Sequence, residues 1–163
     1  MKKLYTYFFI LIFFLIISCD GGLEPISKDN RSYLKIDLHF INGKDNWPTK
    51  DSVIAVRVAA FKKIPDSSII IDVIQGNAYF TLESLPLFVD SSSTTFEITD
   101  APVDLKYIAA VMQYDSLITS QRVIGVYTKS GNNKEYSSLF IEIGKKYNIK
   151  INIDFNDLPP MPF

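Results

Sequence analysis

The stretch YNIKINIDF, residues 147–155, alternates apolar and polar side chains more regularly than any other part of the sequence. Tyrosine, isoleucine and phenylalanine occupy every second position, with asparagine, lysine and aspartate between them. Because successive side chains of a strand point to opposite faces of a sheet, this period of two predicts a β-strand with one buried face. The stretch YLKIDLHF, residues 33–40, has the same period and predicts a second strand of this kind.

Three further segments are apolar at almost every position. They are VIAVRVAAF at 53–61, YIAAVM at 107–112 and RVIGVY at 122–127. Short runs rich in β-branched residues are typical of central strands that are covered on both faces. We expect the small residues Ala55, Ala109 and Gly125 to let neighbouring strands or aromatic rings approach closely.

Shorter apolar segments complete the expected fold. Residues 69–74 predict an edge strand or a connection, and other short segments lie at 78–82, 87–89, 95–99 and 139–143. Polar turn residues separate these segments at 42–46, 91–93 and 130–133. A set of about seven to nine short strands without a helical period predicts an all-β domain, an antiparallel β-sandwich, with a closed barrel as the alternative.

The first residues indicate that the chain is exported. Two lysines near the start are followed by an uncharged run at 4–17, which is dominated by phenylalanine, isoleucine and leucine. A basic start, a short apolar run and a small residue before the cut are typical of a secretory signal, and the run is shorter than the roughly 20 residues of a membrane span. We therefore predict a helical signal peptide at 1–18, cut between Ser18 and Cys19.

The residues at this cut carry a resemblance to a known class of proteins. The segment IISC, from Ile16 to Cys19, resembles the lipobox of bacterial lipoproteins, with isoleucine in place of the commoner leucine at position 16. The resemblance implies diacylglycerol on the thiol of Cys19 and cleavage before this residue. Acyl chains, at about 0.8 kcal/mol per buried methylene, would hold the chain on membrane lipid. The alternative is an uncleaved single-span anchor in which Cys19 is incidental, although the sole cysteine of the sequence has no partner for an internal disulfide.

The remaining chain divides into three parts. Residues 19–32 predict a flexible tether that reaches roughly 20 Å, residues 33–157 the β-sandwich domain, and residues 158–163 a proline-rich tail. We expect the domain in the cell envelope, on the periplasmic side or at the surface of the outer membrane. Asp20 resembles the inner-membrane retention signal of enteric bacteria, so the inner membrane is the alternative. The formal net charge of −1 and the lack of a basic patch argue against nucleic acid as a partner.

The body of the sequence carries a second resemblance. Residues 56–61, 107–111 and 123–127, with the ending 144–159, resemble a group of small envelope lipoproteins. Their domains are similar to the prealbumin-like or carboxypeptidase-regulatory-like β-sandwich, with an immunoglobulin-like arrangement as the other possibility. The hydroxyisourate hydrolases share the prealbumin fold, but they use more than one histidine and end in Tyr-Arg-Gly-Ser. This chain has one histidine and ends in Pro-Pro-Met-Pro-Phe, so the resemblance carries over no catalytic residue.

No combination of residues predicts a reaction. His39 is the only histidine, Cys19 is assigned to lipid, and no Gly-x-Ser-x-Gly motif is present. One histidine cannot form a zinc site of the usual kind. His39 beside Asp37 could act as a lone base, or it could be an exposed residue on the polar face of its strand. The sequence therefore predicts a protein that is not an enzyme and that holds no cofactor and no metal.

A few residues are candidates for binding. Oxygen donors for calcium occur in two loops, without EF-hand spacing, at Asp45, Asn46, Asp154, Asn156 and Asp157. Trp47 could stack on a sugar or a peptide, or it could cover the open end of the sandwich core. The tail at 158–163 could be an extended recognition segment, or it could lie on the domain.

These observations lead to one functional prediction and its alternatives. We expect a lipid-anchored module of the cell envelope that binds or positions a partner, either a protein or a surface glycan. The alternative is a carbohydrate-binding or accessory enzyme domain that uses Trp47 and acidic residues of the loops. A structural spacer within a larger complex is the third possibility.

Overall fold

The computed structural model describes residues 30–66 and 69–163. The predicted signal peptide, the cut between Ser18 and Cys19, and the tether up to residue 29 lie outside the described residues. The described chain forms nine strands, one α-helix and two short 3-10 helices. In chain order these are β1 (Ser32–Phe40), η1 (Gly43–Asn46), η2 (Lys50–Ser52), β2 (Ala55–Phe61), α2 (Ile69–Ile74), β3 (Ala78–Phe80), β4 (Ser91–Ile98), β5 (Val103–Leu105), β6 (Tyr107–Gln113), β7 (Gln121–Val126), β8 (Leu139–Ile141) and β9 (Lys146–Ile153).

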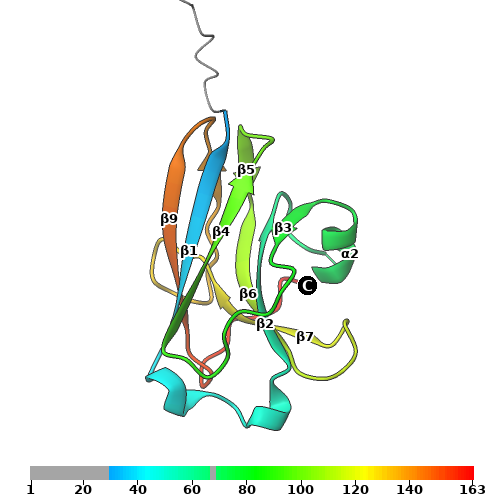
Figure 1. Cartoon of the computed structure of the whole chain (residues 1–163), viewed down its shortest axis with the longest axis vertical. Coiled ribbons are helices and arrows are strands. Elements are labelled where there is room, and N and C mark those ends of the chain that lie inside the picture. The colour runs from blue at the N-terminus through cyan, green and yellow to red at the C-terminus, as the bar shows by residue number, and fades with distance from the viewer. Residues whose placement is uncertain (1–29, 67–68) are drawn as a thin grey trace, which may run out of the picture.

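The strands form a sandwich of two main sheets (Figure 1). The first sheet has the order β4-β1-β9, the second has the order β3-β2-β6-β7, and β5 pairs with β8 in a small third sheet. Every pairing is antiparallel except that of β1 with β9, which is parallel. The predicted all-β sandwich is therefore confirmed, with one parallel pair inside an otherwise antiparallel fold. No helix in the described part of the chain is long and apolar enough to cross a membrane.

The first sheet is buried on one face only, as the period of two predicts. In β1 the apolar positions Leu34, Ile36, Leu38 and Phe40 are buried, and the polar positions between them are partly or fully exposed. The parallel register places Ile36 opposite Ile149 of β9, so the two strands present their apolar side chains to the same core.

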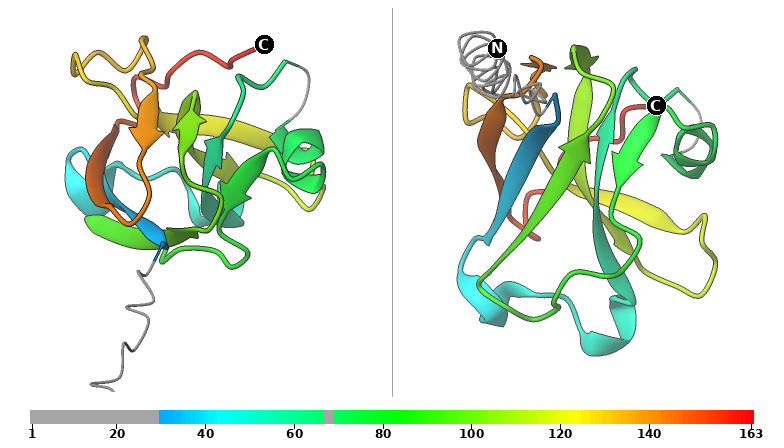
Figure 2. Two further views of the ribbon diagram at one scale, coloured as in Figure 1. Left: turned by 90° about the horizontal axis from the view of Figure 1, so that it is seen from above. Right: turned by 45° about the horizontal axis from the view of Figure 1, so that its top comes forward.

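The second sheet is buried on both faces. The inner face of β2 contributes Val56 and Val58 to the main core, and its outer face contributes Ala59 and Phe61 to a second apolar cluster. Residues of α2 and Met161 of the C-terminal segment pack on this outer cluster. Figures 1 and 2 show α2 at the side of the second sheet that lies away from β1 and β9. The prediction that residues 53–61 form a strand covered on both faces is confirmed.

Gly125 confirms the expectation of a close approach between strands. A Cβ atom at this position would lie 2.7 Å from Cγ2 of Ile151 and 2.8 Å from Cγ1 of Ile153. Both isoleucines belong to β9 of the first sheet, whereas Gly125 belongs to β7 of the second. The missing side chain thus lets the edge strands of the two sheets come together.

Residues 69–74 were expected as an edge strand or a connection, and the structure shows a connection between β2 and β3 rather than an edge strand. They form the helix α2, although their β-branched side chains favour a strand. The helical turn brings Ile69 and Val73, four residues apart, onto the outer cluster of the second sheet. Packing therefore outweighs the local preference of the sequence.

The turn predicted at 91–93 is also corrected. Ser91, Ser92 and Ser93 form the first part of β4, and they pair with His39, Leu38 and Asp37 of β1. The backbone of β1 supplies the hydrogen bonds that these serines would otherwise take from a turn.

A candidate apolar ligand site beside helix α2

A groove of about 280 Å³ lies between α2 and the outer face of the second sheet. We call it the α2 groove. Two of its twelve lining residues are polar, and the rest are apolar. The lining residues are Arg57, Val58, Ala59, Ile69, Ile70, Val73, Ile74, Phe80, Leu82, Val111, Ile118 and Gln121.

The floor of the α2 groove follows from the alternation of the central strands. Ala59 of β2 and Val111 of β6 belong to the outward-facing apolar cluster, and their side chains are buried. Alanine at position 59 extends only one carbon from the backbone, so the floor lies low between the walls. Ile69 and Val73 of α2 lie on one side of this floor.

The rim of the α2 groove leaves large aliphatic side chains in contact with water. Ile74, at the end of α2, is 79% exposed, Leu82 is 76% exposed and Ile118 is 62% exposed. All three line the same groove, although they come from three separate segments of the chain. Scattered exposed apolar residues are ordinary, but a group of them around a concave apolar surface is typical of an interaction site.

An ion pair between a buried aspartate and an exposed lysine holds α2 in position. Asp72 is only 2% exposed, and its carboxylate lies 2.9 Å from Nζ of Lys63. The Asn77 side-chain amide also donates to this carboxylate, at 3.4 Å. The hydrogen bond with Asp72 raises the pKa of Lys63 above its ordinary value. These contacts hold α2, which forms one wall of the groove, to the loops before and after the helix.

Arg57 is the charged residue that lines the α2 groove. Its Nε atom donates to the carbonyl oxygen of Leu82 at 3.3 Å, and its Nη1 atom donates to Oε1 of Gln113 at 3.0 Å. The Gln113 amide is itself held, because its Nε2 atom donates to the carbonyl oxygen of Asp115 at 2.9 Å. The guanidinium is thus oriented by neutral groups.

The structure places Trp47 over one end of the main core. Its indole ring lies 4.4 Å from the ring of Phe40, 5.0 Å from that of Phe155 and 5.1 Å from that of Phe88, measured between centroids. Its Nε1 atom donates to the carbonyl oxygen of Val89 at 3.0 Å. These contacts match the interpretation of Trp47 as a cover for the core, and they use the indole N–H inside the domain.

His39 and Asp37 are not joined in the structure. His39 is exposed, and its side chain makes no hydrogen bond within residues 30–66 and 69–163. The carboxylate of Asp37 instead lies 2.9 Å from Nζ of Lys35. The arrangement gives an exposed residue on a polar face rather than a base oriented by a carboxylate.

The structure brings together the two loops that hold the predicted oxygen donors. The side-chain amide of Asn46 donates to Oδ1 of Asp154 at 3.3 Å, and that of Asn156 donates to Oδ1 of Asn46 at 2.7 Å. Asp157 takes its hydrogen bonds from Asn133 and Lys134. Within the described ranges, no group of three or more histidine, cysteine, aspartate or glutamate side chains could hold a metal ion.

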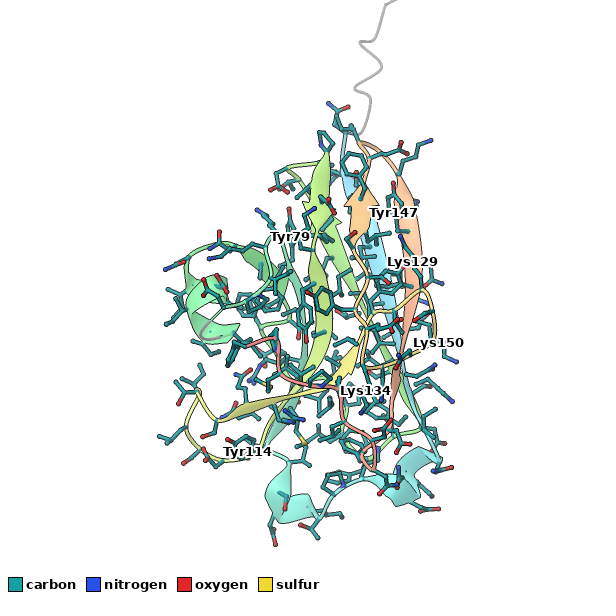
Figure 3. All side chains as sticks on the ribbon, turned by 180° about the vertical axis from the view of Figure 1, so that it is seen from behind. Tyr79, Tyr114, Lys129, Lys134, Tyr147 and Lys150 are labelled. Carbon is teal, nitrogen blue, oxygen red and sulfur yellow. The ribbon has the colours of Figure 1, made fainter. Side chains whose placement is uncertain are left out.

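The C-terminal segment lies on the domain. The guanidinium of Arg122 donates to the carbonyl oxygen of Pro159 at 2.9 Å, and Nζ of Lys134 donates to that of Leu158, also at 2.9 Å. Figure 3 shows Lys134 beside this segment. Its Met161 packs on the outer cluster of the second sheet, so the segment helps to cover the face that α2 leaves open.

Two other hollows of the described surface suit a ligand less well. A cavity of about 40 Å³ under the C-terminal segment has room for little more than a water molecule. It is lined by Tyr107, whose hydroxyl is buried without a partner in the described part of the chain, and burial raises the pKa of this hydroxyl. A shallow depression of about 420 Å³ lies on the first sheet around Lys35 and Lys146. Because Lys146 lies over the ring of Tyr33, 5.9 Å from its centroid, and Lys35 pairs with Asp37, the charged groups there are already engaged.

Sequence reasoning missed the α2 groove. Its walls come from segments far apart in the chain, and one wall is a helix where a strand or connection was expected. One signal was available: Arg57 is the single charged residue in the otherwise apolar run 53–61. A charge at an outward position of a strand covered on both faces indicates a gap in that cover.

A scan against models of protein families, and searches of curated proteins and of solved structures, found no match to this chain. The similarity to prealbumin-like or carboxypeptidase-regulatory-like domains therefore stays a prediction from the sequence.

Proposed function

We propose that this chain is a lipid-anchored, non-enzymatic module of the cell envelope that binds the aliphatic chain of an amphiphilic ligand in the α2 groove. The observation that carries the proposal is an apolar groove of about 280 Å³ with Ile74, Leu82 and Ile118 exposed at its rim. Exposed apolar side chains gathered around a hollow are the usual mark of a surface that binds.

The size of the α2 groove favours one aliphatic chain over a folded protein. Pockets for small molecules enclose roughly 300–1,000 Å³, and the volume of about 280 Å³ is near the lower end of that range. An apolar cavity of roughly 150 Å³ already holds benzene. Because each buried methylene contributes about 0.8 kcal/mol, several methylenes provide useful affinity without any polar contact.

The rigid walls of the α2 groove also support binding. The floor belongs to a sheet buried on both faces, and the ion pair of Asp72 with Lys63 holds the helical wall. A site that exists before the ligand arrives loses little conformational entropy when the ligand binds.

The sequence supports the envelope part of the proposal. Acyl chains on Cys19 and a short tether would keep the domain near membrane lipid, where amphiphiles are available. We propose the periplasmic side or the surface of the outer membrane as its place, with the inner membrane as the alternative that Asp20 suggests. The protein or glycan partner expected from the sequence is replaced in this proposal by an amphiphile.

A photoreactive probe tests the ligand. Isolated membranes that contain the full chain are incubated with a saturated long-chain alcohol that carries a diazirine, and crosslinked peptides are mapped by mass spectrometry. We expect crosslinks on residues 69–74 and 80–82. Ile74→Ser should lower their yield about fivefold, since removing part of the apolar rim costs about 1 kcal/mol of binding free energy.

Ile143→Ser is the matched control, because Ile143 is also exposed but does not line the α2 groove. This control should label like the unchanged chain. Equal labelling of both variants, or crosslinks that cluster around Trp47 instead, would contradict the proposal. Crosslinks around Trp47 would instead support the alternative site at that residue.

A further inference from the structure

We infer that Arg57 selects ligands with a carboxylate head, so that the ligand of the α2 groove is a long-chain fatty acid. The inference rests on the proposed function, because it names the head group of the amphiphile whose chain occupies the groove. The head group is inferred from separate observations, namely the charge and the hydrogen bonds of Arg57.

Arg57 places a charged group against the apolar lining of the α2 groove. Its side chain lines the α2 groove, and its neighbour across the strand pair is Val111, part of the groove floor. A chain lying along the floor would therefore pass within reach of the guanidinium. The other polar lining residue, Gln121, has its amide engaged, because its Nε2 atom donates to the carbonyl oxygen of Ile118 at 2.9 Å.

The guanidinium of Arg57 keeps free hydrogen-bond donors. Arginine has five N–H donors in a planar fork, and two of those on Arg57 are used, by Leu82 and Gln113. The donors of Nη2 have no partner within residues 30–66 and 69–163. The two existing hydrogen bonds hold the fork in place, so its remaining donors are oriented before a ligand binds.

The charge of Arg57 is also uncompensated in the described part of the chain. No carboxylate oxygen there lies within 4.0 Å of its guanidinium. Two acidic residues on neighbouring segments are otherwise engaged: Asp72 pairs with Lys63, and Asp115 accepts from the backbone N–H of Leu117 at 2.7 Å. A half-buried cation beside apolar walls favours an anionic partner, because the partner replaces the water that the walls exclude.

The single charge of Arg57 favours a carboxylate over a phosphate monoester. Arg57 is the one charged residue among those that line the α2 groove. A phosphate monoester carries about −1.5 to −2 charges at neutral pH and would be only partly neutralised. A carboxylate carries one charge and matches the planar fork of arginine.

Paired probes test the inference. Membranes that contain the full chain are treated with three diazirine probes of the same chain length, ending in a carboxylate, a primary alcohol or a methyl ester. Labelling of residues 69–74 and 80–82 is normalised to the labelling of bulk membrane protein by the same probe. We expect the carboxylate to label at about one tenth of the concentration that the two neutral probes need.

Substitutions then assign this preference to Arg57. Arg57→Met removes the charge and keeps an apolar stem, and should remove the tenfold preference, so that the carboxylate and the alcohol label at equal concentrations. Arg57→Lys should keep part of the preference, because it keeps the charge. Lys150→Met is the matched control for loss of a surface cation, since Lys150 lies exposed on the first sheet, and it should behave like the unchanged chain.

The outcomes separate the two proposals. Equal labelling by carboxylate, alcohol and ester in the unchanged chain overturns the selection by Arg57 and leaves the aliphatic site standing. A preference that survives in Arg57→Met also overturns it. Labelling of these segments by none of the probes overturns both. The comparison of the carboxylate with its ester needs no substitution, so it decides the matter even where a variant fails to fold.

Discussion

Gly125 is a residue at which the two sheets approach closely, and its substitution tests the packing of the sandwich. An added methyl group would meet Cγ2 of Ile151 at 2.7 Å, Cγ1 of Ile153 at 2.8 Å and the backbone oxygen of Asn152 at 3.2 Å. We expect Gly125→Ala to lower the free energy of unfolding by about 1–3 kcal/mol, the usual effect of overpacking a core.

Urea unfolding measures this effect through the fluorescence of Trp47, the only tryptophan, which lies against three aromatic rings of the core. The midpoint should fall without a change of slope. Ser93→Ala serves as the control, because it also places alanine in a strand, at an exposed position. An unchanged midpoint in Gly125→Ala would mean that β7 and β9 lie further apart than described.

The residues differ in how far the sequence could predict their surroundings. Gly125 was predictable, because glycine within an apolar strand has few roles other than a close approach. Trp47 left two interpretations open, since an aromatic ring in a loop serves a ligand or a core equally well. Arg57 indicated a gap in the cover of its strand but not a groove, because the groove beside it is formed by a helix and a loop that are distant in sequence.

At the scale of elements, α2 depends on a contact that the local sequence does not contain. A run of isoleucine and valine favours a strand, and a helix of six residues is unstable by itself. The ion pair of Asp72 with Lys63 and the packing of Ile69 and Val73 on the second sheet supply what local preference lacks. This dependence explains why residues 69–74 do not form the edge strand that was one of the two predictions, whereas the predictions of the alternating strands were correct.

The same ion pair predicts how stability depends on pH. The hydrogen bond with Asp72 raises the pKa of Lys63 in the folded protein above its ordinary value of 10.5. The stability that Lys63 contributes is therefore fully present below about pH 10.5 and is lost as the pH rises through the raised pKa. We expect Lys63→Met to be less stable than the unchanged chain near pH 8, with the difference shrinking at about pH 11.

Urea unfolding at a series of pH values measures this difference. Lys150→Met is the control for the loss of an exposed lysine, because Lys150 forms no ion pair within the described ranges. Its difference from the unchanged chain should not vary with pH in the same window. A constant difference for Lys63→Met would show that the pair with Asp72 does not hold α2.

At the scale of the whole molecule, the two sheets are covered unequally. The first sheet faces water on its outer side, whereas the second is covered by α2 and the C-terminal segment. The α2 groove is the part of the second sheet's outer face that this cover leaves open. The sequence predicted which strands are covered on two faces, because periodicity reports burial. It could not predict the parallel pairing of β1 with β9, because periodicity does not name the partner of a strand.

The lipid anchor is the prediction that places this molecule in the cell, and it concerns residues outside the described structure. If the thiol of Cys19 carries diacylglycerol, Cys19→Ser should abolish incorporation of radiolabelled palmitate and prevent cleavage after Ser18. Gel electrophoresis should show the loss of cleavage as well, because an uncleaved chain keeps residues 1–18 and migrates more slowly than the processed form.

Ser18→Ala is the matched control, since alanine is also a small residue before the cut and should leave both lipid labelling and processing intact. The two substitutions separate lipid on Cys19 from an uncleaved apolar span. With a span, label would be absent from the unchanged chain and Cys19→Ser would alter neither its size nor its fractionation. That result would remove the lipid anchor from the proposal, while the uncleaved span would still hold the α2 groove beside membrane lipid.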